Sequence, residues 1–110
     1  MKKAVAYLFG NDIIGTVKFT DEDSCILIEA DIKGVEESGY RISVNDTFED
    51  YDLIILPKPC QKRIKIIFYI DCFSYFDLCG KRICIKNKEN IALADGNIMR
   101  VIYGKRYYSQ

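Results

Sequence analysis

Histidine, the residue type most often used for chemistry near neutral pH, does not occur in this chain of 110 residues. Its imidazole is the one side chain whose unperturbed pKa lies close to neutrality, and it is the commonest protein ligand of copper and of catalytic zinc. A Ser-His-Asp triad, a histidine-bearing zinc hydrolase site and a blue-copper site are therefore all excluded. We expect no metal cofactor.

The remaining nucleophiles and soft metal ligands are five cysteines: Cys25, Cys60, Cys72, Cys79 and Cys84. None forms a Cys-x-x-Cys pair, so a zinc ribbon or a thioredoxin-like motif has no local support. Because the count is odd and no signal peptide precedes them, we expect reduced thiols that serve as small buried apolar residues. One disulfide, a metal-holding set, or an enzyme with a cysteine nucleophile are the alternatives, and such an enzyme would have no histidine to act as its base.

The charges of the chain balance, with 16 Lys and Arg against 16 Asp and Glu. No global field would attract nucleic acid or anionic lipid, so we expect neither as a partner. No apolar run approaches the ~20 residues that a membrane helix needs, and the first residues enter a strand pattern without a signal-peptide core. The sequence therefore predicts one soluble, unsecreted domain over residues 1–110.

Short β-strands must position these side chains, because apolar and polar residues alternate along most of the chain. Over residues 26–33, for example, Ile26, Ile28, Ala30 and Ile32 fall on one face. The expected strands cover residues 3–9, 13–20, 26–33, 40–45, 53–56, 63–70, 81–86 and 99–104, with loops at 46–52, 71–80 and 87–97. Eight strands separated by Gly, Asp and Asn predict an all-β fold, an antiparallel Greek-key barrel or sandwich.

Several runs within these strands resemble the copper/zinc superoxide dismutases. They are Lys3-Ala4-Val5, Gly15-Thr16-Val17-Lys18-Phe19, Ile32-Lys33-Gly34-Val35 and Arg100-Val101-Ile102-Tyr103-Gly104, with Gln110 at the end. Order and spacing agree over most of the first 50 and the last 30 residues. The resemblance implies an eight-stranded Greek-key barrel, and the chain is tens of residues shorter than a typical member, which implies shortened loops.

The resemblance also implies which positions correspond to the family's metal site. Ser43 and Asn45 stand where two copper histidines belong, and Lys86 stands where a third belongs. Asp52 matches the zinc aspartate, but the loop with the bridging histidine and the other zinc ligands is almost entirely deleted between residues 46 and 53. The resemblance therefore implies a chain with vestigial site positions, no bound metal and no dismutase activity.

Three further expectations follow from these matches. Lys86 brings a positive charge to the former copper position and would pair with an acid such as Asp46 or Asp52. Asn90 falls where the family has an aspartate that links the two metal sites. Arg100 matches the arginine that guides superoxide to copper, so here it would serve a structural hydrogen bond or contact an anion or a partner.

As a truncated chain without histidine, this protein resembles the superoxide-dismutase-like proteins of poxviruses. This resemblance implies a catalytically inactive protein, not an enzyme, in the host cytoplasm or the virion. Its implied role is that of a decoy that engages a host protein, either the copper chaperone or the host superoxide dismutase. The alternative is a structural component of the virion with no specific host partner.

Two surfaces are candidates for contacts with a partner. The family's homodimer packs on its carboxy-terminal strand, where this chain has Lys105, Arg106, Tyr107 and Tyr108. Because buried unpaired charges are costly, we expect that homodimer to be lost, leaving a monomer or a differently arranged dimer. A group of aromatic residues would either cover the barrel or form a partner surface: Phe68, Tyr69, Phe73, Tyr75, Phe76, Tyr103, Tyr107 and Tyr108.

Overall fold

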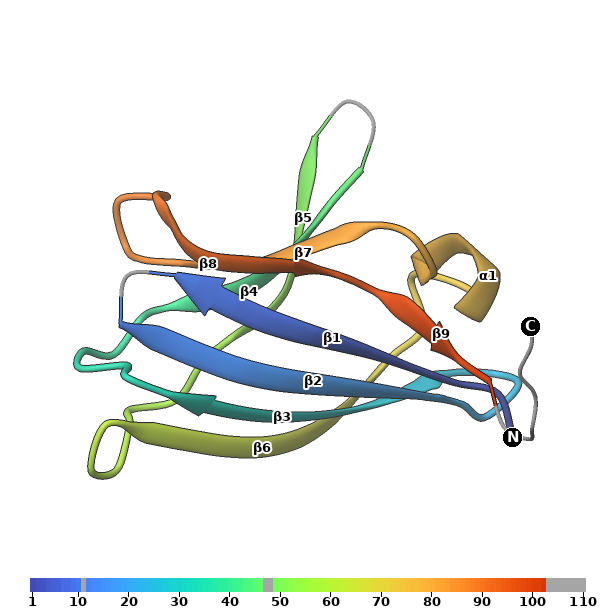
Figure 1. Ribbon diagram of the computed structural model, residues 1–110, viewed down its shortest axis with the longest axis horizontal. Coiled ribbons are helices and arrows are strands. Elements are labelled where there is room, and N and C mark those ends of the chain that lie inside the picture. Colours follow the sequence, from blue (N-terminus) through green and yellow to red (C-terminus); the bar gives the residue numbers. More distant parts are fainter. Residues whose placement is uncertain (11, 47–48, 103–110) are drawn as a thin grey trace.

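Antiparallel strands form most of the computed structural model, which describes residues 1–10, 12–46 and 49–102 (Figure 1). The elements are β1 (Lys3–Gly10), β2 (Ile13–Asp21), β3 (Ile26–Lys33), β4 (Arg41–Asn45), β5 (Asp50–Ile55), β6 (Arg63–Ile70), α1 (Tyr75–Leu78), β7 (Arg82–Lys86), β8 (Ala92–Asn97) and β9 (Met99–Val101). The strand order is β5-β4-β7-β8-β1-β2-β3-β6, and β9 also pairs with β1.

The strand order makes the sheet a nearly closed, barrel-like structure. Chain connections from β3 to β4 and from β6 to β7 cross over, which is the Greek-key pattern. In Figure 1, β1, β2, β3 and β6 form one wall, while β8, β7, β4 and β5 form the other. The prediction of an all-β antiparallel barrel or sandwich is confirmed.

The core lies between the two walls and follows the period-two pattern of the sequence. On β3, Ile26, Ile28, Ala30 and Ile32 are all buried, as predicted. Ala4, Ala6 and Leu8 of β1 face the same interior, together with residues of β4 and β7. Since a one-residue slip would turn each strand's apolar set outward, this alternation determines the register.

The second half of the predicted loop over residues 87–97 is in fact a strand, so the prediction is wrong there. β8 pairs with β7 along its length and with β1 at its Asp95. Its sequence, ALADGN, is rich in residues that strands disfavour, so local propensity conceals it. Pairing on both sides outweighs that propensity, and a Cβ on Gly96 would clash with the Tyr7 carbonyl oxygen.

Three other boundaries differ from the prediction. β5 spans Asp50–Ile55, so it begins inside the stretch expected to be a polar loop and ends before Leu56. Within the expected loop 71–80, α1 forms a single turn capped by the Ser74 side chain, which accepts a hydrogen bond from the Asp77 N–H at 3.2 Å. The last expected strand ends at Val101 among the described residues, and buried Ile98 separates β8 from β9.

The cysteines are free thiols, but most are not buried as expected. Only Cys84 is buried, Cys25 and Cys79 are half-buried, and Cys60 and Cys72 are exposed. The exposed pair lies in the segments before β6 and after it, where the alternation that predicts burial does not apply.

The aromatic residues divide between the core and the surface. Tyr75 is buried, Phe68 and Phe73 pack against the core, and Tyr69 and Phe76 are each 60% exposed. Tyr103, Tyr107 and Tyr108 lie outside the described residues. No helix in the described part of the chain is long and apolar enough to cross a membrane.

Candidate functional site

A network of ion pairs covers the outer face of the wall formed by β5, β4, β7 and β8. Residues of alternate parity on these strands share this face, because their neighbours Ile42, Val44, Ile83 and Ile85 point into the core. The register places Ser43 between Cys84 and Asp52, and Asn45 between Arg82 and Asp50. Tertiary pairing thus brings four of the six positions that were predicted to be vestigial, Ser43, Asn45, Asp52 and Lys86, onto one surface.

Lys86 is the most buried charged residue of this face, with a side chain only 7% exposed. Its ammonium donates to Asp50 Oδ2, and the Asn45 side-chain amide donates to Asp50 Oδ1 at 2.5 Å. The hydrogen bonds from Lys86 and Asn45 lower the pKa of the Asp50 carboxyl below its ordinary value. Lys86 and Asn45 are therefore held together through one carboxylate.

The prediction that Lys86 pairs with Asp46 or Asp52 is wrong. Asp50, which lies opposite Asn45 at the start of β5, takes their place, although the register puts Lys86 opposite Arg41 at the other end of β4. Asp46 instead accepts from Lys81 Nζ at 3.2 Å. Asp52 belongs to a second cluster on the same face.

That second cluster is built around Arg41, a residue that sequence reasoning missed. The guanidinium donates to Asp52 Oδ2 at 3.2 Å and to Asn90 Oδ1 at 2.9 Å. The Ser43 hydroxyl donates to the other oxygen of Asp52 at 2.5 Å. Arg41 alternates with Ser43 and Asn45 along β4, and this spacing was the signal that could have found it.

The turn between β7 and β8 presents Asn90 to Arg41. The Asn87 side chain accepts hydrogen bonds from the backbone N–H groups of Glu89 and Ile91, both at 3.0 Å, which closes the turn. Asn90 lies in it with a φ of 64°, a conformation that asparagine tolerates better than most residues. Asn90 thereby joins the vestigial positions Ser43 and Asp52 through one guanidinium.

The rest of the face is also paired. Arg82 Nε donates to Asp95 Oδ2 at 2.8 Å, and the same carboxylate is one cause that raises the Arg82 pKa. Cys84 lies beneath these pairs, and burial raises the pKa of its thiol. A buried thiol with a raised pKa is a poor nucleophile.

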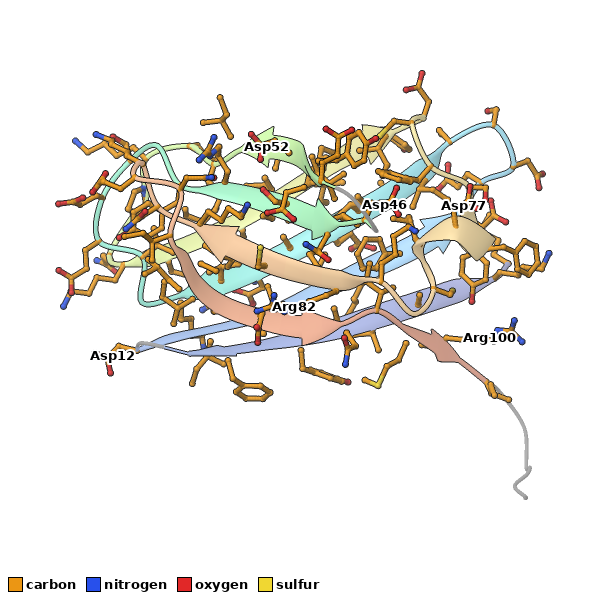
Figure 2. The ribbon with its side chains drawn as sticks, turned by 90° about the horizontal axis from the view of Figure 1, so that it is seen from above. Asp12, Asp46, Asp52, Asp77, Arg82 and Arg100 are labelled. Carbon is orange, nitrogen blue, oxygen red and sulfur yellow. The ribbon has the colours of Figure 1, made fainter. Side chains whose placement is uncertain are left out.

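The structure does not bring Arg100 to this face. Arg100 lies on β9 opposite Ala4, well away from Asp52 and Arg82 (Figure 2). It neighbours Tyr75, whose hydroxyl donates to the Lys3 carbonyl oxygen at 2.7 Å. Burial raises the pKa of the Tyr75 phenol, and the Arg100 guanidinium acts against that rise.

The donor groups on this face do not fit the copper or zinc that members of the resembled family hold. The three copper positions offer a hydroxyl, an amide and a protonated amine, and an amine that carries a proton has no free electron pair for a metal. The nearby carboxylates already accept from Lys86, Arg41 and Arg82. Among the residues that the structure describes, no group of three Cys, Asp or Glu side chains could hold a metal ion.

The four predicted interface residues, Lys105, Arg106, Tyr107 and Tyr108, lie outside the described residues. Comparison of the chain with protein-family models and with curated proteins finds no match to either.

Proposed function

We propose that this chain is a catalytically inactive homologue of copper/zinc superoxide dismutase that acts by protein contact. Its partner is a host protein of the dismutase pathway, the copper chaperone or the dismutase itself, and its location is the host cytoplasm or the virion. The proposal rests on the sequence resemblance, and the Greek-key barrel agrees with the architecture that the resemblance implies.

The single observation that carries the proposal is the ion pair between Lys86 and Asp50. At the position that corresponds to a copper ligand, a lysine whose side chain is 7% exposed holds a positive charge against the wall of the barrel. A fixed cation there repels a metal ion, and the carboxylate that would attract one is already neutralised. This arrangement supports a chain that has lost dismutase catalysis. The barrel is retained, and its surface is available for contacts with other proteins.

The remaining candidate for catalysis has little support. An enzyme with a cysteine nucleophile needs a thiolate and a base, whereas the chain has no histidine and Cys84, the cysteine of the ion-paired face, is buried with a raised pKa. Nucleic acid is not a proposed partner because the charges balance both in the whole chain and on the ion-paired face.

The test is a binding experiment with purified copper chaperone and purified dismutase over a micromolar concentration series. We expect saturable one-to-one binding to one of them. We expect the double variant Lys105→Glu/Arg106→Glu to lose at least about tenfold in affinity, because interface charge reversal places like charges together. The matched control is Lys33→Glu/Lys58→Glu, which reverses two exposed lysines elsewhere and should bind as the wild type does.

Two outcomes would contradict the proposal. Binding to neither host protein, together with incorporation of the chain into purified virions, would favour the structural role instead. Protein purified with copper and zinc supplied should contain well under one metal ion per chain, so a stoichiometric copper content with dismutase activity would show that the site is not vestigial.

A further inference from the structure

β6 is an edge strand of the sheet, and one side of its backbone is open. It stands at one end of the strand order, and its partner strand within the described residues is β3. At its start, Arg63 exchanges both backbone hydrogen bonds with Cys60, each at 3.0 Å, on the side away from β3. Because backbone groups alternate from side to side along a strand, Lys65, Ile67 and Tyr69 also direct their N–H and C=O groups to that side. Among the described residues, these three have no backbone partner there.

The edge of β6 lacks the features by which proteins protect an open strand. From Ile66 to Ile70 it has no charged residue and no proline, and its register with β3 is regular. The opposite edge of the sheet, β5, is shorter, carries Asp50 and Asp52, and pairs with β4 in an irregular register. Short, charged or irregular edges resist pairing with another chain, whereas a regular apolar edge is a template for it.

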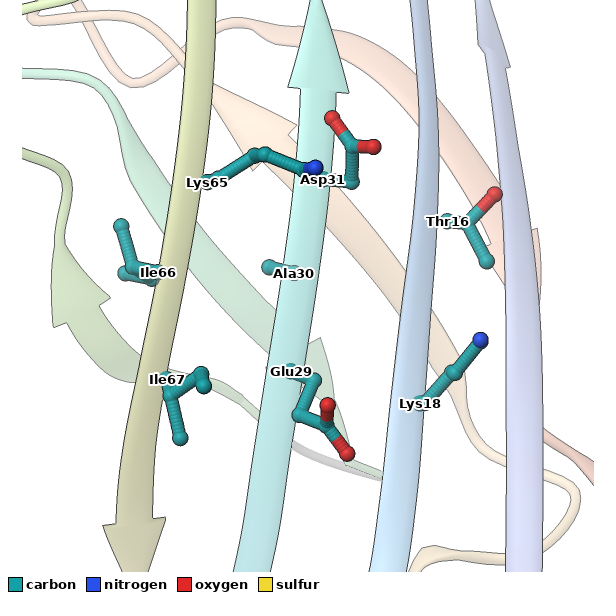
Figure 3. Close-up of a pocket in the computed structure, with 8 residues that line it drawn as sticks. All are labelled: Thr16, Lys18, Glu29, Ala30, Asp31, Lys65, Ile66 and Ile67. Atoms are coloured by element: carbon teal, nitrogen blue, oxygen red, sulfur yellow. The ribbon is translucent and has the colours of Figure 1, made fainter.

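Both faces of β6 present apolar side chains at this edge. On the outer face, Ile67 is 68% exposed and Tyr69 is 60% exposed. On the inner face, Ile66 and Phe68 pack against the core but stay half-buried, because no strand of the described chain adjoins β6 on its open side. Figure 3, a view of the shallow hollow over β2, β3 and β6, shows Ile66 and Ile67 on this stretch, with β3 along one side.

We propose that the open edge of β6 is the contact surface between two copies of this chain, whose β6 strands pair across a two-fold axis. A two-fold contact presents the same residues from both copies, and a strand edge paired with itself in this way is antiparallel. The wall formed by β1, β2, β3 and β6 then continues into the same wall of the second copy. The proposal does not depend on the proposed host partner, and it uses no residue of the expected carboxy-terminal interface.

The open backbone groups and the side chains agree on a register centred at Ile67. With this centre, Ile67 faces its own equivalent and Lys65 faces Tyr69 of the second copy, so the three open residues of each copy all exchange backbone hydrogen bonds. On the inner face, Ile66 lies opposite Phe68 of the second copy. The two half-buried apolar side chains therefore cover each other.

The neighbouring registers leave backbone groups unpaired. A centre one residue earlier, at Ile66, would place Tyr69 opposite Arg63, whose backbone groups are already bonded within the turn before β6. A centre one residue later, at Phe68, would place Lys65 opposite a residue beyond the end of β6. Only the register centred at Ile67 uses every open group of the edge.

The contact is small, because the paired stretch covers only residues 65–69 of each copy. Interfaces below ~1,200 Å² are typical of weak and transient association. We therefore expect a reversible dimer with a dissociation constant on the order of 100 μM.

The test is sedimentation equilibrium of the full chain from micromolar to millimolar concentration. We expect a dimer at the upper end, and we expect Ile67→Lys to weaken association at least about tenfold, because two ammonium groups would meet on the axis. The matched control is Ile55→Lys on β5, where the side chain is 67% exposed, and this variant should associate as the wild type does. Because both positions are exposed, both variants should fold.

A mixture of variants tests the axis itself. Ile67→Lys and Ile67→Glu should each associate weakly alone, and an equimolar mixture should regain association, because the new ammonium of one faces the new carboxylate of the other. A wild-type monomer throughout, equal effects of Ile67→Lys and Ile55→Lys, or no gain on mixing would each overturn the proposal. Loss of the dimer in Ile14→Lys would also overturn it, since the contact would then lie on the outer face of β2.

Discussion

At the scale of single residues, the distinctive feature is a lysine that lies against the barrel wall and is paired with one acid. Lys86 is nearly buried, whereas the Asp50 side chain remains 32% exposed and has Asn45 as a second donor. Removal of one partner therefore has a different effect on stability depending on which charge is left unpaired. A solvated carboxylate can stay charged alone, but a buried ammonium cannot.

The first prediction concerns this asymmetry. Asp50→Asn leaves Lys86 without its counter-ion and should lower the free energy of unfolding by roughly 3–5 kcal/mol. In Lys86→Met, the Asp50 carboxylate keeps its hydrogen bonds from Asn45 and water, so the free energy of unfolding should fall by only about 1 kcal/mol. Urea unfolding at neutral pH measures both. Lys86→Met/Asp50→Asn should be more stable than Asp50→Asn alone, and the reverse order would mean that Lys86 is not held as a buried cation.

The second prediction is the acid sensitivity that the lowered pKa of Asp50 implies. A carboxyl whose folded-state pKa lies below its ordinary 3.8 contributes stability above that pH, and the contribution is lost as the pH falls through the folded-state pKa. The wild type should therefore lose stability below about pH 4 more steeply than Asp50→Asn does.

The control for this pH dependence is Asp77→Asn. Asp77 is exposed, and its carboxylate takes part in no ion pair within the described residues. The free energy of unfolding of Asp77→Asn should fall with pH in acid as steeply as that of the wild type. If the free energy of unfolding fell equally steeply in acid for the wild type and for Asp50→Asn, the ion pair between Asp50 and Lys86 would not persist in solution.

At the scale of elements, the ion-paired face depends on two strands that local sequence describes poorly. β5 starts with two aspartates on either side of a tyrosine, and β8 consists largely of Ala, Asp, Gly and Asn. Both form because neighbouring strands supply their hydrogen bonds, and because their acids meet bases on β4 and β7. β8 also needs close contact with β1, which its glycine allows.

The third prediction tests this contact. A Cβ at position 96 would clash with the Tyr7 carbonyl oxygen, which is backbone and cannot move without separating β8 from β1. Gly96→Ala should therefore lower the free energy of unfolding by about 3 kcal/mol or more. In the control, Gly80→Ala, the added Cβ meets no atom within 4 Å, and only the positive φ of 92° is strained, at roughly 1–2 kcal/mol. Equal losses in the two variants would indicate that β1 and β8 are not closely paired.

At the scale of the whole molecule, the two walls of the barrel present different surfaces. One wall carries the ion-paired face over β5, β4, β7 and β8, and the other exposes apolar side chains of β1 and β2, namely Tyr7, Phe9 and Ile14. The charges of the ion-paired face largely neutralise one another, and this wall also exposes the apolar side chains of Ile55 and Ile91.

The fourth prediction tests the proposed homology with the dismutases, under which this chain lacks both the metal-binding loop and the metal ligands. In Ser43→His/Asn45→His/Lys86→His, imidazoles return to the three positions, but no bridging histidine and no zinc-binding loop orient them. Residues that support metal ligands typically account for a further 10–100-fold in affinity. We expect weak copper binding and no dismutase activity, measured by metal analysis and a superoxide assay. Robust activity would mean that the shortened loop is not what disables the site.

The sequence alone determined the fold class and most of the strands, because period-two alternation is a direct consequence of burying one face of a strand. It also excluded histidine chemistry outright, since that depends on composition and not on geometry. Only the tertiary structure decided which charges meet. Lys86 and Asp50 are 36 residues apart, and Arg41 and Asn90 are 49 apart, so their contacts arise from strand order across a crossover and leave no local pattern to read. For the same reason β8 appeared only in the structure, where hydrogen bonds from β7 and β1 outweigh a sequence that by itself favours a loop.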